Sequence, residues 1–157
     1  NTVIMQYMLD WFKHPEHFEM MLWLSQILQA LGIKYAVEHW RRNMPQCMGA
    51  IYWQLNDAWP GPSWSSIDYH GRWKALHHAA RRFFAPVLIS AVEDAKKNTV
   101  EVHVTSDLAR PFRGKVTCNV FTLDGRRIAA EAFPAAVHQN SKNCSTAESF
   151  YSQITCS

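Results

Sequence analysis

The hydrophobic period of this chain changes once, near Pro86, and this change limits the folds open to it. Over residues 15–43 apolar side chains recur at helical spacing, whereas over 100–105 they alternate with polar ones. Two periods on either side of a proline indicate two domains, which we place at residues 1–86 and 87–157. A chain of 157 residues is long enough for one ordinary domain or two small pieces.

The first part contains two predicted helices. Residues 15–43 favour a long helix, because Pro15 suits a first turn and Pro45 ends the run. Its apolar positions nearly surround the axis, as in a helix packed on two sides, and Gly32 leaves open a division into two pieces. A second helix is predicted over Trp73–Phe84, with Pro86 as its stop.

Between these helices lies a near-continuous apolar stretch, Cys47–Leu55, of strand length. Such a stretch is typical of a strand buried on both faces in a parallel sheet, so we expect an α/β arrangement. Residues Asn56–Arg72 then form a loop, marked by Pro60, Gly61 and Pro62. A loop this rich in aromatic residues is expected either to pack down or to form a binding surface.

The second part predicts antiparallel strands. Val100–Thr105 and Val116–Phe121 alternate, Asp124–Gly125 is a two-residue hairpin signal, and Ile128–Phe133 is the expected return strand. This is the start of an immunoglobulin-like sandwich, which needs about seven strands. Residues 138–157 are polar, show no clear period, and are expected to end before the sandwich is complete.

Composition excludes several classes of protein. Hydrophobic residues make up 48% and charged residues 18%, which is globular rather than disordered composition. The net charge of +3 is spread along the chain, so no nucleic-acid partner is expected, and no apolar run is long enough to span a membrane. No signal peptide is visible after Asn1, and the compartment stays open.

Histidines and cysteines form no recognisable metal motif. The eight His include no H-E-x-x-H pattern and the four Cys no C-x-x-C pattern, so we expect neither metal nor cofactor. Cys47 and Cys118 are interpreted as small buried hydrophobes. Whether Cys144 and Cys156 pair is left open.

One long run is chemically unusual: G-A-I-Y-W-Q-L-N-D-A-W-P-G-P-S-W-S-S-I-D-Y-H-G-R-W-K-A-L-H over Gly49–His78. It resembles the β-mannosidase branch of glycoside hydrolase family 2, as do L-S-Q-I-L-Q-A over Leu24–Ala30 and E-H-W-R-R over Glu38–Arg42. The resemblance covers residues 18–90 and weakens afterwards. It implies an incomplete (β/α)₈ barrel remnant, its last helices and eighth strand, followed by a partial immunoglobulin-like β-sandwich.

The resemblance also implies a retaining exo-β-mannosidase with two catalytic glutamates, one in an N-E motif and one in an E-F-G motif. Such carboxylates lie about 5–5.5 Å apart. Neither motif occurs here, so no catalytic residue is assigned. A (β/α)₈ barrel takes about 250 residues. We therefore expect a fragment that is inactive alone, whose partners are a β-mannoside and the missing upstream barrel.

Five residues are the candidate substrate-binding set: Trp53, Asn56, Asp57, Trp59 and Trp64. Barrel active sites lie at the carboxyl ends of the strands, and an indole face suits the C–H face of a sugar. The resemblance favours Trp53 as the floor of the sugar subsite over a core role. Asn56 is open between binding sugar and capping the loop. Capping is favoured for Asp57, and loop anchoring for Trp59 and Trp64.

Asp68 and Arg72 are interpreted as an ion pair or helix cap. Alternative functions are another family 2 exo-glycosidase, of β-glucosaminidase or β-galactosidase type, and a non-catalytic carbohydrate-binding fragment. A binding module would display aromatic residues on one face of a complete sandwich. In this sequence the aromatic residues gather in the helical part instead. A third alternative is an interaction fragment without a function of its own.

Overall fold

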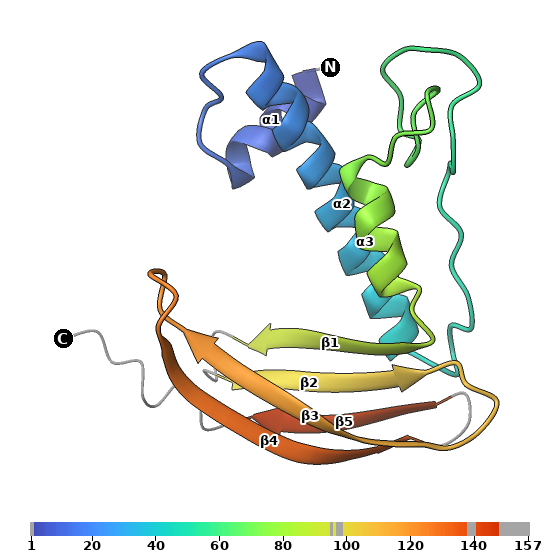
Figure 1. The fold of residues 1–157 in the computed structure, drawn as a ribbon, viewed down its shortest axis with the longest axis vertical. Helices are drawn as coiled ribbons and strands as arrows, with labels where there is room; N and C mark the ends of the chain where they lie inside the picture. Colours follow the sequence, from blue (N-terminus) through green and yellow to red (C-terminus); the bar gives the residue numbers. More distant parts are fainter. Residues whose placement is uncertain (1, 95, 97–98, 138–140, 148–157) are drawn as a thin grey trace. The chain divides into compact units, whose positions relative to one another are not determined.

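The structure is a computed structural model that describes residues 2–94, 96, 99–137 and 141–147, the last of these by backbone alone. The chain divides into two compact units, residues 1–40 with 49–85 and residues 41–48 with 86–157. Each unit is described by itself. The elements in order are α1 Thr2–Trp11, α2 Phe18–Arg42, α3 Ala75–Phe83, β1 Val87–Asp94, β2 Thr99–Ser106, β3 Phe112–Phe121, β4 Arg127–Val137 and β5 Ser141–Ala147 (Figure 1).

The two predicted helices are confirmed as α2 and α3. α2 is one unbroken helix, so Gly32 does not divide it, and a methyl group there would meet nothing within 4 Å. α1 was not predicted, although Ile4, Met8 and Trp11 have helical spacing. Met8 is its buried residue.

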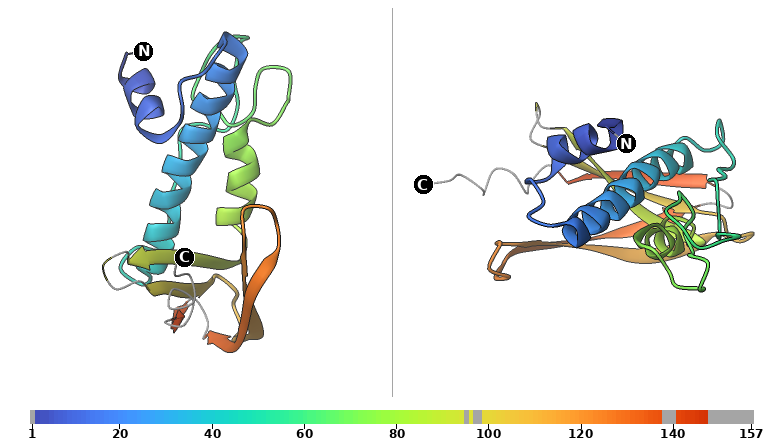
Figure 2. Two further views of the ribbon diagram at one scale, coloured as in Figure 1. Left: turned by 90° about the vertical axis from the view of Figure 1, so that its left-hand side faces the viewer. Right: turned by 90° about the horizontal axis from the view of Figure 1, so that it is seen from above.

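The core of the first unit lies between α2 and α3, which run side by side (Figures 1 and 2). Val37 of α2 and Leu76 and Phe83 of α3 are almost completely buried there. Ala30 and Ala80 belong to the same cluster. Each large apolar side chain buried in this way contributes about 1.5–3 kcal/mol.

The predicted strand over Cys47–Leu55 is wrong. Residues 47–55 are extended but belong to no strand, and their near neighbour Asn56 makes only an isolated bridge with Ile67. A strand is defined by its partners, and no ladder pairs with this stretch in the part of the chain that the structure describes. Ala50 and Tyr52 pack against the helical core, whereas Ile51 is almost fully exposed. Cys47 is half-buried.

The second unit contains two antiparallel sheets, with strand orders β1-β2-β5 and β3-β4. The three strands predicted here are confirmed as β2, β3 and β4. β1 and β5 were not predicted. β5 is polar along its length and pairs with β2, so its pairing partner rather than its own pattern makes it a strand. No strand was predicted within residues 138–157, where β5 lies.

The two sheets share one core (Figure 2). Val102 and Val104 of β2 meet Val116 of β3 and Ala135 and Val137 of β4, and all five are buried. The alternation that predicts β2 and β3 is thus the alternation that places these valines inside. Cys118 lies at the margin of this core, where burial raises the pKa of its thiol.

The β3–β4 hairpin differs from its predicted form. Asp124–Gly125 predicts a two-residue turn, but the loop has three residues, closed by Thr122 N–H donating to the Arg126 carbonyl at 2.9 Å. Gly125 N–H also donates to the Thr122 carbonyl at 2.9 Å, and Gly125 has φ +88°. A turn followed by a left-handed glycine is the usual three-residue hairpin.

Arg41, at the end of α2, belongs to the second unit. Its guanidinium donates to the Asp107 carboxylate at 2.8 Å, just after β2. This contact explains in part why residues 41–48 group with the sandwich strands and not with the rest of α2. No helix in the described ranges is long and apolar enough to cross a membrane.

Candidate functional site: a tryptophan loop closed by a polar network

Backbone hydrogen bonds connect the two ends of the loop between residues 55 and 74. Ile67 N–H donates to the Leu55 carbonyl at 2.8 Å, and Asp57 N–H donates to the Ile67 carbonyl at 3.1 Å. Lys74 N–H donates to the Ser66 carbonyl at 2.9 Å. The start of the loop, its far arm and the first residue before α3 therefore lie against one another.

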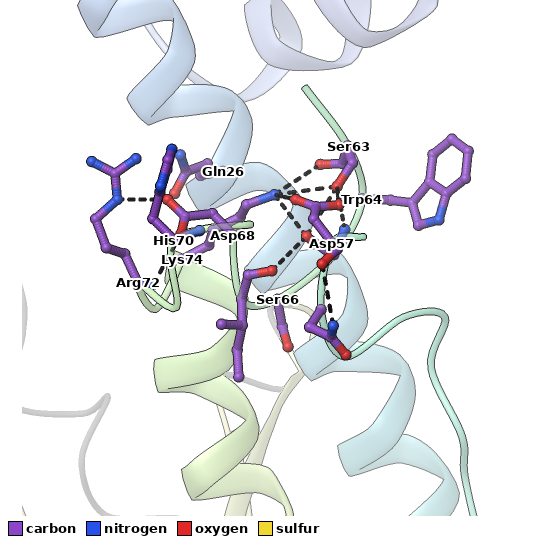
Figure 3. A network of polar contacts seen from close by, with 12 residues as sticks. Gln26, Asp57, Ser63, Trp64, Ser66, Asp68, His70, Arg72 and Lys74 are labelled. Carbon is purple, nitrogen blue, oxygen red and sulfur yellow. Dashed lines mark hydrogen bonds and ion pairs between the residues drawn. The ribbon is translucent and has the colours of Figure 1, made fainter. Parts of the chain in front are cut away.

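Four side chains close the interior of this loop: Asp57, Ser63, Ser65 and Lys74, here called the loop lock (Figure 3). The Lys74 ammonium donates to Asp57 Oδ2 at 3.2 Å and to Ser65 Oγ at 2.8 Å. Ser63 Oγ donates to Asp57 Oδ1, and Ser65 Oγ donates to the Ile67 carbonyl at 2.9 Å. The Asp57 and Lys74 side chains are only 7% and 13% exposed.

The loop lock favours the ionised form of Asp57. The neighbouring Ser63 and Ser65 hydroxyls, together with the nearby Lys74 ammonium, hold the pKa of the Asp57 carboxyl below its usual range. Burial acts in the opposite direction but is the weaker influence. Both carboxylate oxygens are engaged within the loop, as the capping alternative for Asp57 requires. A sugar-binding role for Asp57 stays a prediction.

A second buried hydroxyl, Ser66, links the loop to α3. Its Oγ donates to the Leu55 carbonyl at 2.9 Å and lies 2.9 Å from the Tyr52 hydroxyl and 3.1 Å from His77 Nδ1. A hydroxyl has one proton, so Ser66 must accept from both Tyr52 and His77. The network therefore assigns a proton to Nδ1 of His77.

The predicted pairing of Asp68 with Arg72 is confirmed. Arg72 Nε donates to Asp68 Oδ2 at 2.6 Å, and the other carboxylate oxygen accepts from the backbone N–H groups of His70 and Arg72 at 2.9 Å each. The backbone hydrogen bond from Arg72 is the main reason that the pKa of Asp68 lies below its usual range. Asp68 thus closes the turn at Gly71, which has φ +79°.

The predicted tryptophans all face outward. Trp53, Trp59 and Trp64 are 74%, 75% and 61% exposed. The indole of Trp64 points away from the loop lock, while its carbonyl accepts a hydrogen bond of 2.7 Å from Gln29 Nε2 of α2 (Figure 3). Within the described residues the loop is therefore held by polar side chains and not by packing of Trp59 or Trp64. The Trp53–Gln54 peptide bond is cis.

Asn56 lies at the start of the loop with its side chain exposed. Its Nδ2 donates to the Asp57 carbonyl at 3.2 Å, and its backbone forms the bridge with Ile67. One amide donor is thus used locally, and the amide oxygen is oriented by that contact. The geometry is compatible with either alternative left open for Asn56.

Sequence reasoning missed Ser63, Ser65, Lys74 and Gln29 as residues that shape the site. The first two alternate in S-W-S, a spacing that turns both hydroxyls to one side and the intervening indole to the other. Lys74 lies on the first turn leading into α3, where a cation is not favoured by the helix dipole. A lysine at the N-terminal end of a helix is the one sequence feature that could have predicted a nearby carboxylate partner.

Among the described residues, the site presents exposed aromatic rings and brings together no pair of carboxylates of the kind that hydrolysis requires. It combines exposed indole faces with a neighbouring amide, the usual elements of carbohydrate recognition. No group of three or more His, Cys, Asp or Glu that could hold a metal ion occurs among the residues the structure covers.

Comparison with known proteins shows what the chain as a whole is similar to. Residues 98–155 match the family model described as the mannosidase Ig/CBM-like domain. A goat (Capra hircus) β-mannosidase is 39% identical over 135 residues, which cover 78% of this chain and 15% of the goat protein. The crystal structure of a β-D-mannosidase from Dictyoglomus thermophilum superimposes with a TM-score of 0.78 at 30% identity, over 90% of this chain and 17% of that one.

An exo-chitosanase from Amycolatopsis orientalis also superimposes, with a TM-score of 0.73 over 88% of this chain and 17% of that one. At 18% identity, this similarity shows the fold alone. Together the matches show similarity to the glycoside hydrolases of family 2. Within that family, the chain resembles one segment of the β-mannosidases, as the Gly49–His78 run predicts. It spans about one-sixth of the length of these relatives.

Proposed function

We propose that this chain is the part of a retaining exo-β-mannosidase that provides one wall of the sugar-binding site. In this proposal, residues 1–86 are the last part of the (β/α)₈ barrel, and residues 87–157 begin an immunoglobulin-like sandwich. The whole enzyme would hydrolyse terminal β-D-mannose residues of oligosaccharides or glycoconjugates. The catalytic glutamates would lie outside this chain, which contains neither the N-E nor the E-F-G motif.

The single observation that carries the proposal is the display of Trp53, Trp59 and Trp64. Exposing three large indoles costs free energy unless a ligand or another part of the protein covers them. The loop that bears two of them is nonetheless well ordered by the loop lock. A rigid loop with outward aromatic rings is the arrangement expected of a sugar platform.

A chimera tests this proposal directly. The homologous segment of the goat enzyme is replaced by this chain, and hydrolysis of p-nitrophenyl β-D-mannopyranoside is measured. We expect activity on the mannoside, and a loss of at least about tenfold in kcat/KM on Trp53→Ala, because an aromatic contact contributes on the order of 1 kcal/mol and more when buried by the ligand. Trp23→Ala, on the exposed surface of α2, is the matched control and is expected to have little effect.

The same chimera decides between the alternatives. A folded chimera that cleaves a β-glucosaminide or β-galactoside in preference to the mannoside would favour another family 2 specificity. A folded chimera that cleaves none of the three glycosides would overturn the enzyme proposal. The unmodified goat enzyme, prepared in parallel, shows that the assay works.

A further inference from the structure

We propose that Lys74 is a positioning residue: by bridging Asp57, Ser63 and Ser65, it closes the base of the tryptophan loop and holds Trp59 and Trp64 outward for a sugar. The inference rests on the proposed function for the identity of the ligand. The ordering of the loop by Lys74 rests on the geometry alone.

The Lys74 ammonium is committed entirely to this loop. It has three N–H donors, and four oxygen atoms surround it: Ser65 Oγ at 2.8 Å, Asp57 Oδ2 at 3.2 Å, and Ser63 Oγ and carbonyl at 3.3 and 3.4 Å. With 13% of its side chain exposed, it has little access to a ligand. Lys74 therefore acts through other residues and does not contact substrate.

The partners of Lys74 enclose both loop tryptophans along the chain. Asp57 and Ser63 bracket residues 58–62, which include Trp59, and Ser63 and Ser65 flank Trp64. The backbone on each side of both indoles is thus tied to one ammonium group. Fixing the ends of a short segment removes most of its conformational freedom before a ligand arrives.

The Lys74 ammonium completes the hydrogen bonding of the two hydroxyls. Ser63 donates its proton to Asp57, and Ser65 donates its proton to the Ile67 carbonyl. The two hydroxyl oxygens lie 2.9 Å apart; Ser63 Oγ accepts from the Ser65 backbone N–H at 3.0 Å, and each oxygen can accept from a further donor. Lys74 supplies that donor to both oxygens and also neutralises the Asp57 charge. Removing it leaves a largely buried carboxylate without its cation.

The test uses the 157-residue chain, with backbone and indole dynamics followed by ¹⁵N relaxation. In the unmodified chain, the indole N–H groups of Trp59 and Trp64 are expected to have order parameters near those of rigid backbone, about 0.85. In Lys74→Met, they should fall below about 0.6, while those of Trp23 and Trp73 stay unchanged. Arg72→Met, which removes the exposed pair with Asp68, is the matched control and should leave Trp59 and Trp64 rigid.

Two further variants keep the proposal falsifiable should Lys74→Met unfold. Ser63→Ala keeps the Asp57–Lys74 pair and removes one bridge, so it should loosen Trp59 and Trp64 to a smaller degree. The double variant Asp57→Asn/Lys74→Met leaves no buried charge and should fold better than Lys74→Met while its loop stays mobile. Rigid indoles in either variant would overturn the proposal.

A titration with methyl β-D-mannopyranoside then separates this inference from the proposed function. We expect indole shifts in the unmodified chain and a weakening of affinity between about tenfold and 100-fold in Lys74→Met. If the indole shifts of the unmodified chain do not change with the mannoside, the result counts against the proposed sugar-binding function. The relaxation data would still test whether Lys74 holds the loop rigid. Binding that is unchanged in a Lys74→Met chain with a mobile loop would overturn the positioning role.

Discussion

Asp57 and Trp53 are four residues apart and show opposite environments. The Asp57 carboxylate is enclosed by two hydroxyls and an ammonium, whereas the Trp53 indole is largely solvent-exposed. The sequence could not predict that the two environments differ, because both residues lie in the same W-Q-L-N-D motif that resembles the β-mannosidases. The difference depends on Ser63, Ser65 and Lys74, which approach Asp57 only after the loop has folded back.

At the residue scale, we expect protonation of the Asp57 carboxylate at low pH to loosen the loop. The folded-state pKa of Asp57 lies below the unfolded value of about 3.9, so its contribution is fully present above that value and is lost as the pH falls through the folded pKa. We expect the indole shifts of Trp59 and Trp64 to change as the pH falls below the unfolded value of about 3.9, and this change to be absent in Asp57→Asn.

Asp68 is the necessary comparison, since its pKa is lowered as well. Asp68→Asn should keep the acid response of Trp59 and Trp64, because Asp68 pairs with Arg72 outside the loop lock. Loss of the response in Asp68→Asn, with its retention in Asp57→Asn, would contradict the assignment.

At the scale of elements, periodicity was a good guide wherever an element's partners lie in the chain. α2, α3, β2, β3 and β4 were found where their patterns predict them, and some of the apolar residues of each pattern form the two cores, among them five valines, Leu76 and Phe83. The stretch 47–55 has the pattern of a buried strand, but no strand among the described residues pairs with it. β5 shows the converse, since a polar segment becomes a strand through its register with β2.

Two glycines give opposite predictions at this scale. Gly32→Ala should raise the free energy of unfolding by about 1 kcal/mol, because alanine is the better helix former and open space surrounds the site. Gly125→Ala should lower it by about 1 kcal/mol, because φ +88° is strained for any residue with a Cβ. Urea denaturation followed by far-ultraviolet circular dichroism measures both.

Gly61→Ala serves as the control for the loop, since Gly61 has open space around it and is not one of the two positive-φ glycines, Gly71 and Gly125. Its free energy of unfolding should change by no more than about 0.5 kcal/mol. Equal effects of Gly32→Ala and Gly125→Ala would contradict the argument from backbone conformation.

At the scale of the whole molecule, the chain exposes far more large apolar side chains than a self-sufficient domain would be expected to. Ile51, Leu55 and the three site tryptophans are exposed in one continuous segment, and Trp23, Tyr35 and Trp40 are exposed on α2. Exposed apolar surface of this kind promotes association. We expect the purified chain to self-associate as its concentration rises, as light scattering after size-exclusion chromatography would measure.

The isolated chain should hydrolyse no aryl β-mannoside. Retaining hydrolysis needs two carboxylates in one site, and the described site contains no such pair, because Asp57 and Asp68 are each held in their own network. The check is p-nitrophenol release by the purified chain against a mock preparation and a Glu101→Gln, Glu131→Gln variant. Turnover above the mock preparation would refute the fragment interpretation.

The loop lock separates what holds the loop from what the loop presents. Its four members lie at positions 57, 63, 65 and 74, so the five residues between Asp57 and Ser63 take no part in it through their side chains. Those five positions can be substituted without removing any side chain of the loop lock. A library randomised over residues 58–62 could therefore change the ligand preference of this surface while each member retains the same frame, which makes the loop a starting point for engineering.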